Sequence, residues 1–338
     1  MREAEQYKRM PDGGAACFLC QRRCFIRKGS RGFCGVRENR GGKLYTLNWG
    51  KCISHAIDPI EKKPFYHFCP GSPVFSFAAA GCNFRCEHCQ NWEISQSGTI
   101  SGLEIPPGRM AKMALESGSE GIAYTYTEPT IFFEYAKDTA KLARKSGLYN
   151  VFVTNGYQTE ETIGALDFLD AARVDLKSFD DKFYRKTCGE AHLEPVLKAI
   201  AGLHKKMHVE IITLLIPTLN DSDDEIRALS KWIRKLDCDI PLHFTGYYPA
   251  NRMALPPTPS ETLAKARKIA TEEGLNYVYT GNRPGDEGES TYCPKCKCCL
   301  IKRFGFEIME NRLAKEGKCP ECGMKLPIIT DWKKGRKN

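Results

Sequence analysis

No apolar run in this sequence approaches the roughly 18 residues of a membrane-spanning helix, so we expect no membrane contact. We also find no secretory signal, no internal repeat and no long low-complexity linker. Only the lysine-rich tail at residues 331–338 has a composition typical of disorder. These absences predict a folded protein of the reducing cytoplasm, where clustered cysteines usually bind metal and seldom form disulfides.

The chain has 338 residues, and 42% of them are hydrophobic. That is enough to bury the core of one large α/β domain with small appendages, or of two domains. Lys and Arg outnumber Asp and Glu by 50 to 41, which gives a formal net charge of +9. The basic surplus fits acidic or phosphate-bearing partners such as nucleic acid, and it also fits anionic metal–thiolate centres.

Seventeen cysteines, many of them in close pairs, are the strongest signal in the composition. Most of them fall into three groups along the chain. The groups are Cys17-x2-Cys20-x3-Cys24-x9-Cys34, then Cys82-x3-Cys86-x2-Cys89, then Cys293-x2-Cys296 and Cys319-x2-Cys322 with Cys298 and Cys299 nearby. The cysteines outside these groups fit small buried side chains or exposed thiols, and they are Cys52, Cys69, Cys188 and Cys238.

Between the second and third groups, short apolar runs alternate with segments of helical periodicity. Runs rich in β-branched and aromatic residues predict strands at 74–78, 121–126, 150–153, 173–176, 209–216, 242–246 and 277–279. Helical periods lie between them, for example at 108–117, 130–145, 159–169 and 224–236. This alternation predicts an α/β fold in which helices wrap a parallel sheet, as in a partial or closed βα barrel.

The second group, Cys82, Cys86 and Cys89, directly follows a predicted strand. A four-iron cluster bound by three thiolates of one tight loop keeps one iron without a protein ligand. An open metal position is typical of a reactive centre, whereas a closed one is structural. Such an iron can chelate the amino and carboxylate groups of S-adenosylmethionine (SAM), whose reductive cleavage gives methionine and a 5′-deoxyadenosyl radical. The alternative is a zinc site that uses His88 as its fourth ligand.

The segments AGCNFRCEHCQNWEIS at 80–95 and DPIEKKPFYHFCPG at 58–71 resemble radical SAM enzymes similar to pyruvate formate-lyase activating enzyme. The resemblance is closer still to the branch called the AmmeMemoRadiSam system, and it spans the chain from Cys17 to the final CxxC. His88 departs from the family, which usually has an aromatic residue there. The resemblance implies a partial (βα)6 TIM-like barrel over residues 51–285, a [4Fe-4S] cluster, SAM, and a low-potential electron donor of the flavodoxin or ferredoxin type.

The resemblance also implies cofactor-binding residues at the ends of later strands. Glu128 stands where the family often has Gly-Gly-Glu for the SAM amino group, although both glycines are missing here. Asn155 takes the place of a residue near the SAM carboxylate or ribose, and His243 one near the adenosine. Asp175 and Lys177 resemble a D-x-K motif that lies beside SAM and helps to bind a monovalent cation. Each residue also has a structural alternative: Glu128 can be a helix-opening acid, and Asn155 can belong to an Asn-Gly turn. His243 can be a core histidine, and Asp175 and Lys177 can form a buried ion pair.

The third group predicts a zinc-ribbon-like module over residues 286–330. Its knuckles, Cys293 with Cys296 and Cys319 with Cys322, bring four thiolates into a closed tetrahedron around Zn2+. Cys298 and Cys299 adjoin each other and make the poorer pair. A closed site argues for stability or a partner surface rather than for catalysis.

The first group lies in a cysteine-rich metal-binding segment over residues 1–50. Cys17, Cys20, Cys24 and Cys34 fit zinc or a second iron–sulfur cluster that relays electrons, and the spacing does not decide between them. We favour zinc slightly. Nearby arginines stabilise either anionic centre.

The leading functional prediction is a radical SAM oxidoreductase that activates a glycyl radical protein or acts on an unidentified substrate. One alternative is a radical enzyme that modifies nucleic acid such as tRNA, with the basic ribbon holding the RNA and Phe304 and Phe306 as stacking residues. A second alternative is a non-enzymatic zinc-binding scaffold in which all three cysteine groups are structural.

Overall fold

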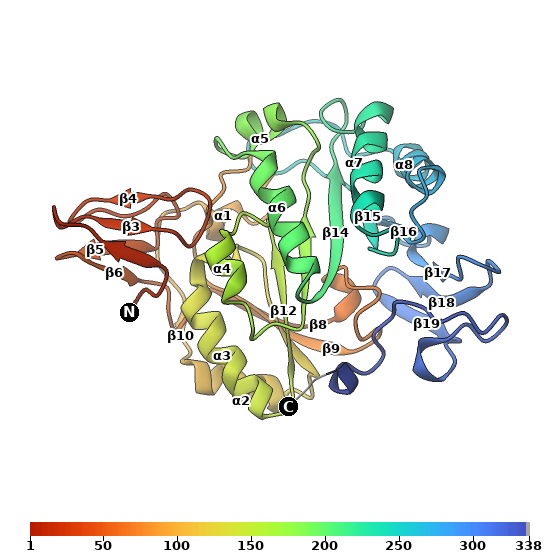
Figure 1. Cartoon of the computed structure of the whole chain (residues 1–338), viewed down its shortest axis with the longest axis horizontal. Coiled ribbons are helices and arrows are strands. Elements are labelled where there is room, and N and C mark those ends of the chain that lie inside the picture. Colours follow the sequence, from red (N-terminus) through yellow and green to blue (C-terminus); the bar gives the residue numbers. More distant parts are fainter. Residues whose placement is uncertain (336–338) are drawn as a thin grey trace.

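The computed structural model describes residues 1–335, and its centre is one eight-stranded sheet (Figure 1). The strands are β8 (Ser54–Pro59), β9 (Pro73–Ala78), β11 (Gly121–Tyr124), β12 (Tyr149–Thr154), β13 (Ala171–Asp175), β14 (His208–Leu215), β15 (Leu242–Gly246) and β16 (Val278–Gly281). β8 pairs antiparallel with β9, and the remaining strands continue from β9 in parallel and in chain order. β8 and β16 form the two edges, so the sheet is an open, partial α/β barrel, as predicted.

Helices carry the chain from the carboxyl end of each parallel strand back to the start of the next (Figure 1). They are α2 (Pro107–Glu116), α3 (Phe133–Lys145), α4 (Glu160–Gly164), α5 (Asp181–Thr187), α6 (Leu193–His204), α7 (Asp223–Leu236) and α8 (Ser260–Glu272). Because helices and other segments cover both faces, β12 is buried at every position, and apolar or aromatic residues predominate in it.

Helix α7 shows why these segments form helices. The Ser222 side chain accepts a hydrogen bond from the Glu225 backbone N–H and so caps the first turn, where acidic residues also complement the helix dipole. Ile226, Leu229 and Ile233 then repeat on one buried face. The sequence pattern predicts this helix to within one residue.

Helix α4 is shorter than the predicted segment at 159–169. Thr159 caps its first turn, but the helix ends at Gly164, a residue with low helix propensity. Leu166 and Phe168 then enter the core, where the Phe168 ring packs 6.0 Å from the Phe152 ring. The prediction was wrong here because tertiary packing outweighs local periodicity.

Two small modules flank the barrel on opposite sides (Figure 1). The N-terminal one has two antiparallel sheets, and its strands are β1 (Arg2–Glu3), β2 (Tyr7–Arg9), β3 (Ala15–Cys17), β4 (Phe25–Ile26), β5 (Arg37–Arg40) and β6 (Lys43–Thr46). The C-terminal one has a single antiparallel sheet of β17 (Thr291–Tyr292), β18 (Cys299–Phe304) and β19 (Glu307–Asn311). The module boundaries named above stay predictions.

The start of the predicted basic tail is ordered. A 3-10 turn spans Trp332–Gly335, and the Trp332 ring packs edge-on against Tyr149 in the barrel at 6.1 Å between centroids. The last three residues, 336–338, lie outside the described part of the chain. Among the described helices, we find none that is both long and apolar enough to cross a bilayer.

Candidate functional site

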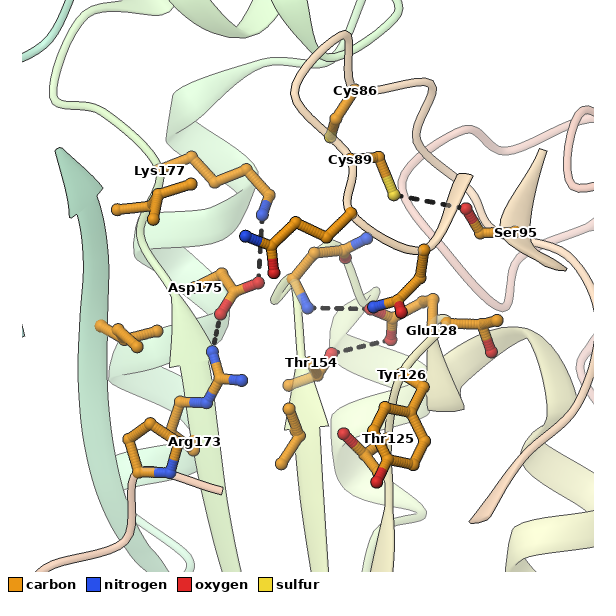
Figure 2. Close-up of a pocket in the computed structure, with 18 of the residues that line it drawn as sticks. Cys86, Cys89, Ser95, Thr125, Tyr126, Glu128, Thr154, Arg173, Asp175 and Lys177 are labelled. Atoms are coloured by element: carbon orange, nitrogen blue, oxygen red, sulfur yellow. Dashed lines mark hydrogen bonds and ion pairs between the residues drawn. The ribbon is translucent and has the colours of Figure 1, made fainter. Parts of the chain in front are cut away.

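A cavity of about 400 Å³ lies at the carboxyl ends of the parallel strands, where the catalytic groups of βα barrels are found. Asn155 after β12, Asp175 at the end of β13, Leu214 in β14 and Thr245 in β15 all line it. The loop that follows β9 closes one side and brings in the sulfurs of the second cysteine group (Figure 2).

The loop after β9 turns sharply at Gly81, whose φ of 100° favours glycine. A Cβ atom on Gly81 would lie 2.9 Å from the carbonyl oxygen of Cys34 in the N-terminal module, so no side chain fits there. The turn directs Cys82 into the cavity, where its sulfur accepts a hydrogen bond from the Phe84 backbone N–H at 3.3 Å. Phe84 is buried and lines the same cavity.

Polar partners surround the sulfurs of this loop. The Asn155 side-chain amide lies 3.9 Å from the Cys82 sulfur. The Ser95 hydroxyl lies 3.4 Å from the Cys89 sulfur (Figure 2). Burial raises the pKa of the Cys82 thiol well above its ordinary value, and the nearby Glu128 carboxylate raises it further. A metal that binds here must therefore displace the thiol protons.

The three sulfurs are not drawn together as ligands of one small ion. Within residues 1–335, a single group of three or more potential ligands has all its ligand atoms within 4.8 Å of one another, and it lies in the C-terminal module. Cys82, Cys86 and Cys89 therefore spread more widely, as thiolates on different irons of one cluster must. His88 does not join them in a zinc shell; its buried Nδ1 has no hydrogen-bond partner. The three thiols thus fit a four-iron cluster better than zinc.

Asp175 and Lys177 both line the cavity, as their alternating positions predict. Lys177 Nζ donates to Asp175 Oδ2 at 3.0 Å, and the Arg173 guanidinium pairs with the other carboxylate oxygen (Figure 2). The alternative of a structural ion pair is thus realised within the cavity. The sequence analysis did not predict Arg173 as a cavity residue. Because Arg173, Asp175 and Lys177 occupy alternate positions in the sequence, they lie on the same face, and this spacing could have indicated it.

Glu128 also lines the cavity, but groups of the protein itself already donate hydrogen bonds to both of its carboxylate oxygens. Its Oε1 accepts from the Thr130 backbone N–H at 2.9 Å and the Thr154 hydroxyl at 2.7 Å, and its Oε2 accepts from the Asn155 backbone N–H at 2.8 Å. It caps the short 3-10 helix that Pro129 opens, as the alternative reading expected. Oε2 retains room for a further donor, while burial raises the pKa of the carboxyl group.

Asn155 joins the end of β12 to the cysteine loop. Its Nδ2 donates to Asn83 Oδ1 at 2.7 Å, and its Oδ1 accepts from the Tyr157 backbone N–H at 3.0 Å. The second bond is the turn expected of Asn-Gly, and the first fixes the position of the residue after Cys82. Asn155 therefore positions the loop from across the cavity.

His243 does not line the cavity. Leu242–Gly246 forms β15, so His243 stands near the start of its strand and not at the end, as the sequence interpretation assumed. The cavity-lining residue is Thr245, and the His243 ring turns to Glu210, with 2.7 Å between Nε2 and Oε2. His243 is 2% exposed and stacks on Tyr279, so the core-histidine alternative holds.

Cys188 lies beside the cysteine loop, although it is remote in the sequence. Its thiol lies close to the Cys86 thiol, and its carbonyl oxygen accepts from the Arg85 backbone N–H at 3.3 Å. Tyr126, two residues before Glu128, also lines the cavity, and its hydroxyl donates to Asp58 at 2.8 Å. No local pattern marks Cys188, because tertiary contacts alone bring it to the site.

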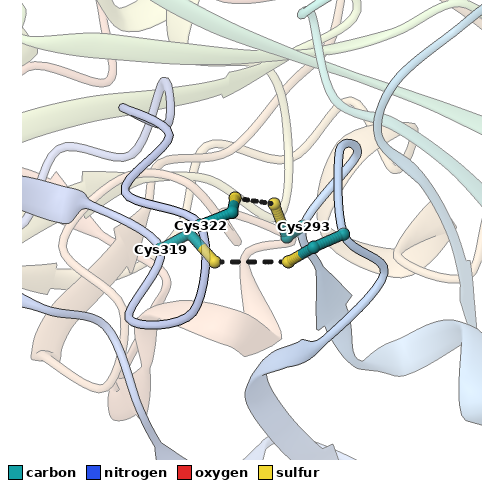
Figure 3. Close-up of side chains that lie close together, drawn as sticks. Cys293, Cys319 and Cys322 are labelled. Atoms are coloured by element: carbon teal, nitrogen blue, oxygen red, sulfur yellow. Dashed lines mark hydrogen bonds between the residues drawn. The ribbon is translucent and has the colours of Figure 1, made fainter.

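The C-terminal group brings together the four cysteines that the spacing predicts (Figure 3). The Cys293 and Cys322 sulfurs lie 3.6 Å apart, and those of Cys296 and Cys319 lie 3.5 Å apart. Zinc–sulfur bonds of about 2.3 Å place the sulfurs of a tetrahedral site about 3.8 Å apart, so these thiols fit one metal ion. Cys298 is a near neighbour at 3.4 Å from Cys319. This four-cysteine cluster suggests an additional metal.

Comparison with known proteins relates this architecture to a family. The profile of the radical SAM superfamily matches residues 78–230. The uncharacterized protein MJ0808 of Methanocaldococcus jannaschii is 46% identical over 336 residues, which cover 97% of this chain and 100% of that protein. The putative glycyl-radical enzyme activating enzyme MJ1632 of the same organism is 29% identical over 195 residues, or 56% of this chain and 74% of that protein.

A solved structure resembles the fold. The crystal structure of a radical SAM methyltransferase from Sphaerobacter thermophilus aligns with a TM-score of 0.50 over 73% of this chain and 75% of that chain. At 16% identity, this likeness concerns the fold alone. The matching family profile and the near full-length relative show that the chain belongs to the radical SAM superfamily, whose members use a [4Fe-4S] cluster and SAM.

Proposed function

We propose that this radical SAM enzyme holds its cluster on Cys82, Cys86 and Cys89 and cleaves SAM reductively in the adjoining cavity. The observation that carries the proposal is that one loop delivers three widely spaced thiols to a polar cavity of about 400 Å³. When bound there, the cluster supplies an open iron for the methionine end of SAM and an electron for its sulfonium.

The charged residues of the cavity suit the two charges of an amino-acid end. Arg173 and Lys177 can bind a carboxylate, since both lie in the cavity wall and share a single acidic partner, Asp175. The free lone pair of Glu128 Oε2 can accept from an ammonium group. Asn155 positions the cysteine loop through Asn83. His243 has no part in this proposal.

A monovalent cation at Asp175 is disfavoured by the same geometry. The carboxylate already has a guanidinium on one oxygen and an ammonium on the other. A further cation would lie within contact distance of both positive groups and be repelled by them. We therefore leave the cation out of the proposed site.

The finer proposal is that the radical abstracts hydrogen from a glycine of a partner protein. Its support is the resemblance of the cysteine-loop segment to activating enzymes, together with the similarity to MJ1632, which is named a putative glycyl-radical enzyme activating enzyme. On the same resemblance, we propose that the chain belongs to the AmmeMemoRadiSam branch and that a flavodoxin or ferredoxin serves as its reductant. Transfer of deuterium from a glycine-deuterated partner protein into 5′-deoxyadenosine would test the substrate class. Superfamily membership makes the non-enzymatic scaffold alternative wrong.

The experiment for the core proposal is anaerobic reconstitution with iron and sulfide, followed by SAM and dithionite. The wild-type protein is expected to release 5′-deoxyadenosine, and the Cys82→Ala and Cys89→Ala variants are expected to release none. Cys238→Ala is the matched control, because this half-buried thiol lies outside all three cysteine groups. Deoxyadenosine release by Cys89→Ala at the wild-type rate would refute the assignment of the cluster.

A further inference from the structure

The four N-terminal cysteines line one small buried pocket, although they come from different parts of the module. Cys17 ends β3, Cys20 and Cys24 lie in the turn between β3 and β4, and Cys34 precedes β5. All four are free thiols, the first two buried and the others half-buried. Apolar side chains and arginines complete the lining, namely Leu19, Ile26 and Ile131 together with Arg22, Arg23 and Arg37. Four thiols gathered in one buried pocket form a ligand set of the kind that binds metal.

Arg37 shows that the pocket is built for an anion. Its side chain is 1% exposed, lines the same pocket, and pairs through Nη2 with Glu134 at 2.6 Å. Its Nε and Nη1 are also buried but have no hydrogen-bond partner. Unpaired guanidinium donors are costly to bury, and neutral thiols are weak acceptors. A negatively charged metal–thiolate centre in the pocket would satisfy the guanidinium charge.

The sulfur spacing distinguishes this pocket from the C-terminal site. The four C-terminal thiols all lie within 4.8 Å of one another, as a single zinc ion requires, whereas the N-terminal thiols do not form such a group among the described residues. The second pair also differs, because nine residues separate Cys24 from Cys34 and no CxxC knuckle forms there. Four thiolates that bind four different irons need this wider spread.

We propose that Cys17, Cys20, Cys24 and Cys34 hold a second [4Fe-4S] cluster, with one thiolate on each iron and the Arg37 guanidinium beside it. This reverses the slight preference for zinc that the spacing alone suggested. The centre is closed, since each iron has a protein ligand, so it does not bind SAM.

The second centre lies directly behind the cysteine loop of the proposed SAM site. The Cys34 carbonyl oxygen faces Gly81 so closely that a Cβ atom on residue 81 would lie only 2.9 Å from it. Arg22, from the segment between Cys20 and Cys24, donates through Nε to the Asn83 carbonyl oxygen at 2.9 Å. Its guanidinium also stacks 4.0 Å above the Phe33 ring. The N-terminal cluster would therefore support the backbone that carries Cys82.

The test is metal counting on the full-length protein after anaerobic reconstitution with iron and sulfide. The wild type is expected to bind about eight irons, the content of two four-iron clusters. A triple variant, Cys82→Ala with Cys86→Ala and Cys89→Ala, is expected to keep about four irons and a brown colour. Its reduced EPR signal should not change when SAM is added. The Cys20→Ala, Cys24→Ala double variant is expected to keep the SAM-sensitive signal alone, and Cys238→Ala should match the wild type.

The triple variant decides the proposal even if the N-terminal double variant fails to fold. A triple variant without iron but with a second equivalent of zinc, beyond that of the C-terminal site, would overturn it. If instead the wild type binds about four irons and only the N-terminal double variant loses them, the second cluster stands and the proposed SAM-site cluster fails. The two proposals therefore fail in different ways.

Discussion

The C-terminal cysteine group and the loop after β9 place thiols on short loops, but their surroundings differ. At the C-terminus each sulfur has another sulfur as its neighbour, at 3.6 Å between Cys293 and Cys322. In the loop, the Cys82 and Cys89 sulfurs neighbour Asn155 and Ser95 and face a cavity. Cysteine spacing thus sets how many thiols a loop offers, whereas the surrounding side chains determine whether a metal bound there would be fully enclosed or would keep an open coordination position.

The buried contacts around the two sites differ in the same way. Arg303 of β18 is fully buried and donates to Thr291 at 2.8 Å and to the Tyr66 carbonyl oxygen at 3.1 Å, which joins the C-terminal module to the barrel. The cavity instead keeps Arg173 and Lys177 on its wall. The first arrangement is structural, and the second suits a ligand.

The largest expected effect is on SAM cleavage and comes from Cys86→Ala. This variant should lose deoxyadenosine formation completely, because a cluster with two thiolates is not retained. Its thermal midpoint should stay close to that of the wild type. A deoxyadenosine assay and a melting curve measure the two properties. If the variant still cleaved SAM, the loop after β9 would not differ from the C-terminal site in being catalytic.

Cys319→Ala should show the opposite behaviour. The variant should lose one equivalent of zinc and melt at a lower temperature, because small metal modules derive their fold from the ion. Its rate of SAM cleavage per cluster should remain that of the wild type. Zinc analysis and calorimetry test this, and a loss of cleavage without a loss of stability would contradict a structural role.

Arg303→Met should destabilise the protein by about 3–5 kcal/mol, since it leaves the buried Glu61 carboxylate without its ion-pair partner. Urea unfolding measures the change. The matched control is Arg312→Met, which breaks the exposed pair with Glu321 on the same module and should cost less than about 1 kcal/mol. Equal effects of the two variants would argue against a stabilising role of the buried Arg303–Glu61 pair between the C-terminal module and the barrel.

Lys177→Met should raise the KM for SAM by roughly 10- to 100-fold, the range expected when a charge-assisted hydrogen bond is lost. Iron content and thermal midpoint should not change. Lys182→Met on the exposed side of α5 is the control and should leave the KM unaltered. An unchanged KM in Lys177→Met would mean that Lys177 only pairs with Asp175 and does not bind SAM.

The smallest effect concerns pH and His67, which joins the C-terminal module to the barrel. Its Nδ1 donates to the Pro327 carbonyl oxygen at 3.2 Å, and its Nε2 accepts from the Tyr279 hydroxyl at 2.7 Å. Burial lowers the pKa of His67 to about 3, although Glu210 opposes this shift.

Because the unfolded chain takes up this proton near pH 6.5, stability falls as the pH drops from about 6.5 toward 3. Replacing His67 by Gln removes up to one proton from the uptake on unfolding. The slope of the unfolding free energy against pH should therefore decrease by up to about 1.4 kcal/mol per pH unit. Urea midpoints between pH 7 and 5 measure the slope, with exposed His55→Gln as the control. Parallel slopes for all three proteins would contradict the buried, neutral state of His67.

Local patterns predicted the parallel strands and most of the helices. The seven predicted strand runs coincide with β9, β11, β12, β13, β14, β15 and β16. Such strands are buried on both faces and therefore read as short apolar runs. The antiparallel edge strand β8 was not predicted, because its mixed burial lacks that pattern. His243 was placed at the wrong end of its strand, since the run 242–246 does not indicate which of its residues reaches the cavity.

The amino-acid sequence alone fixes which loops carry cysteines and how many thiols each loop offers, because these properties depend on neighbours a few residues apart. The tertiary structure alone decided that Arg173 pairs with Asp175, that Cys188 lies beside Cys86, and that Arg37 faces the N-terminal thiols. The physical reason is that contacts, burial and charge balance arise between segments distant in the chain. No short-range pattern encodes them.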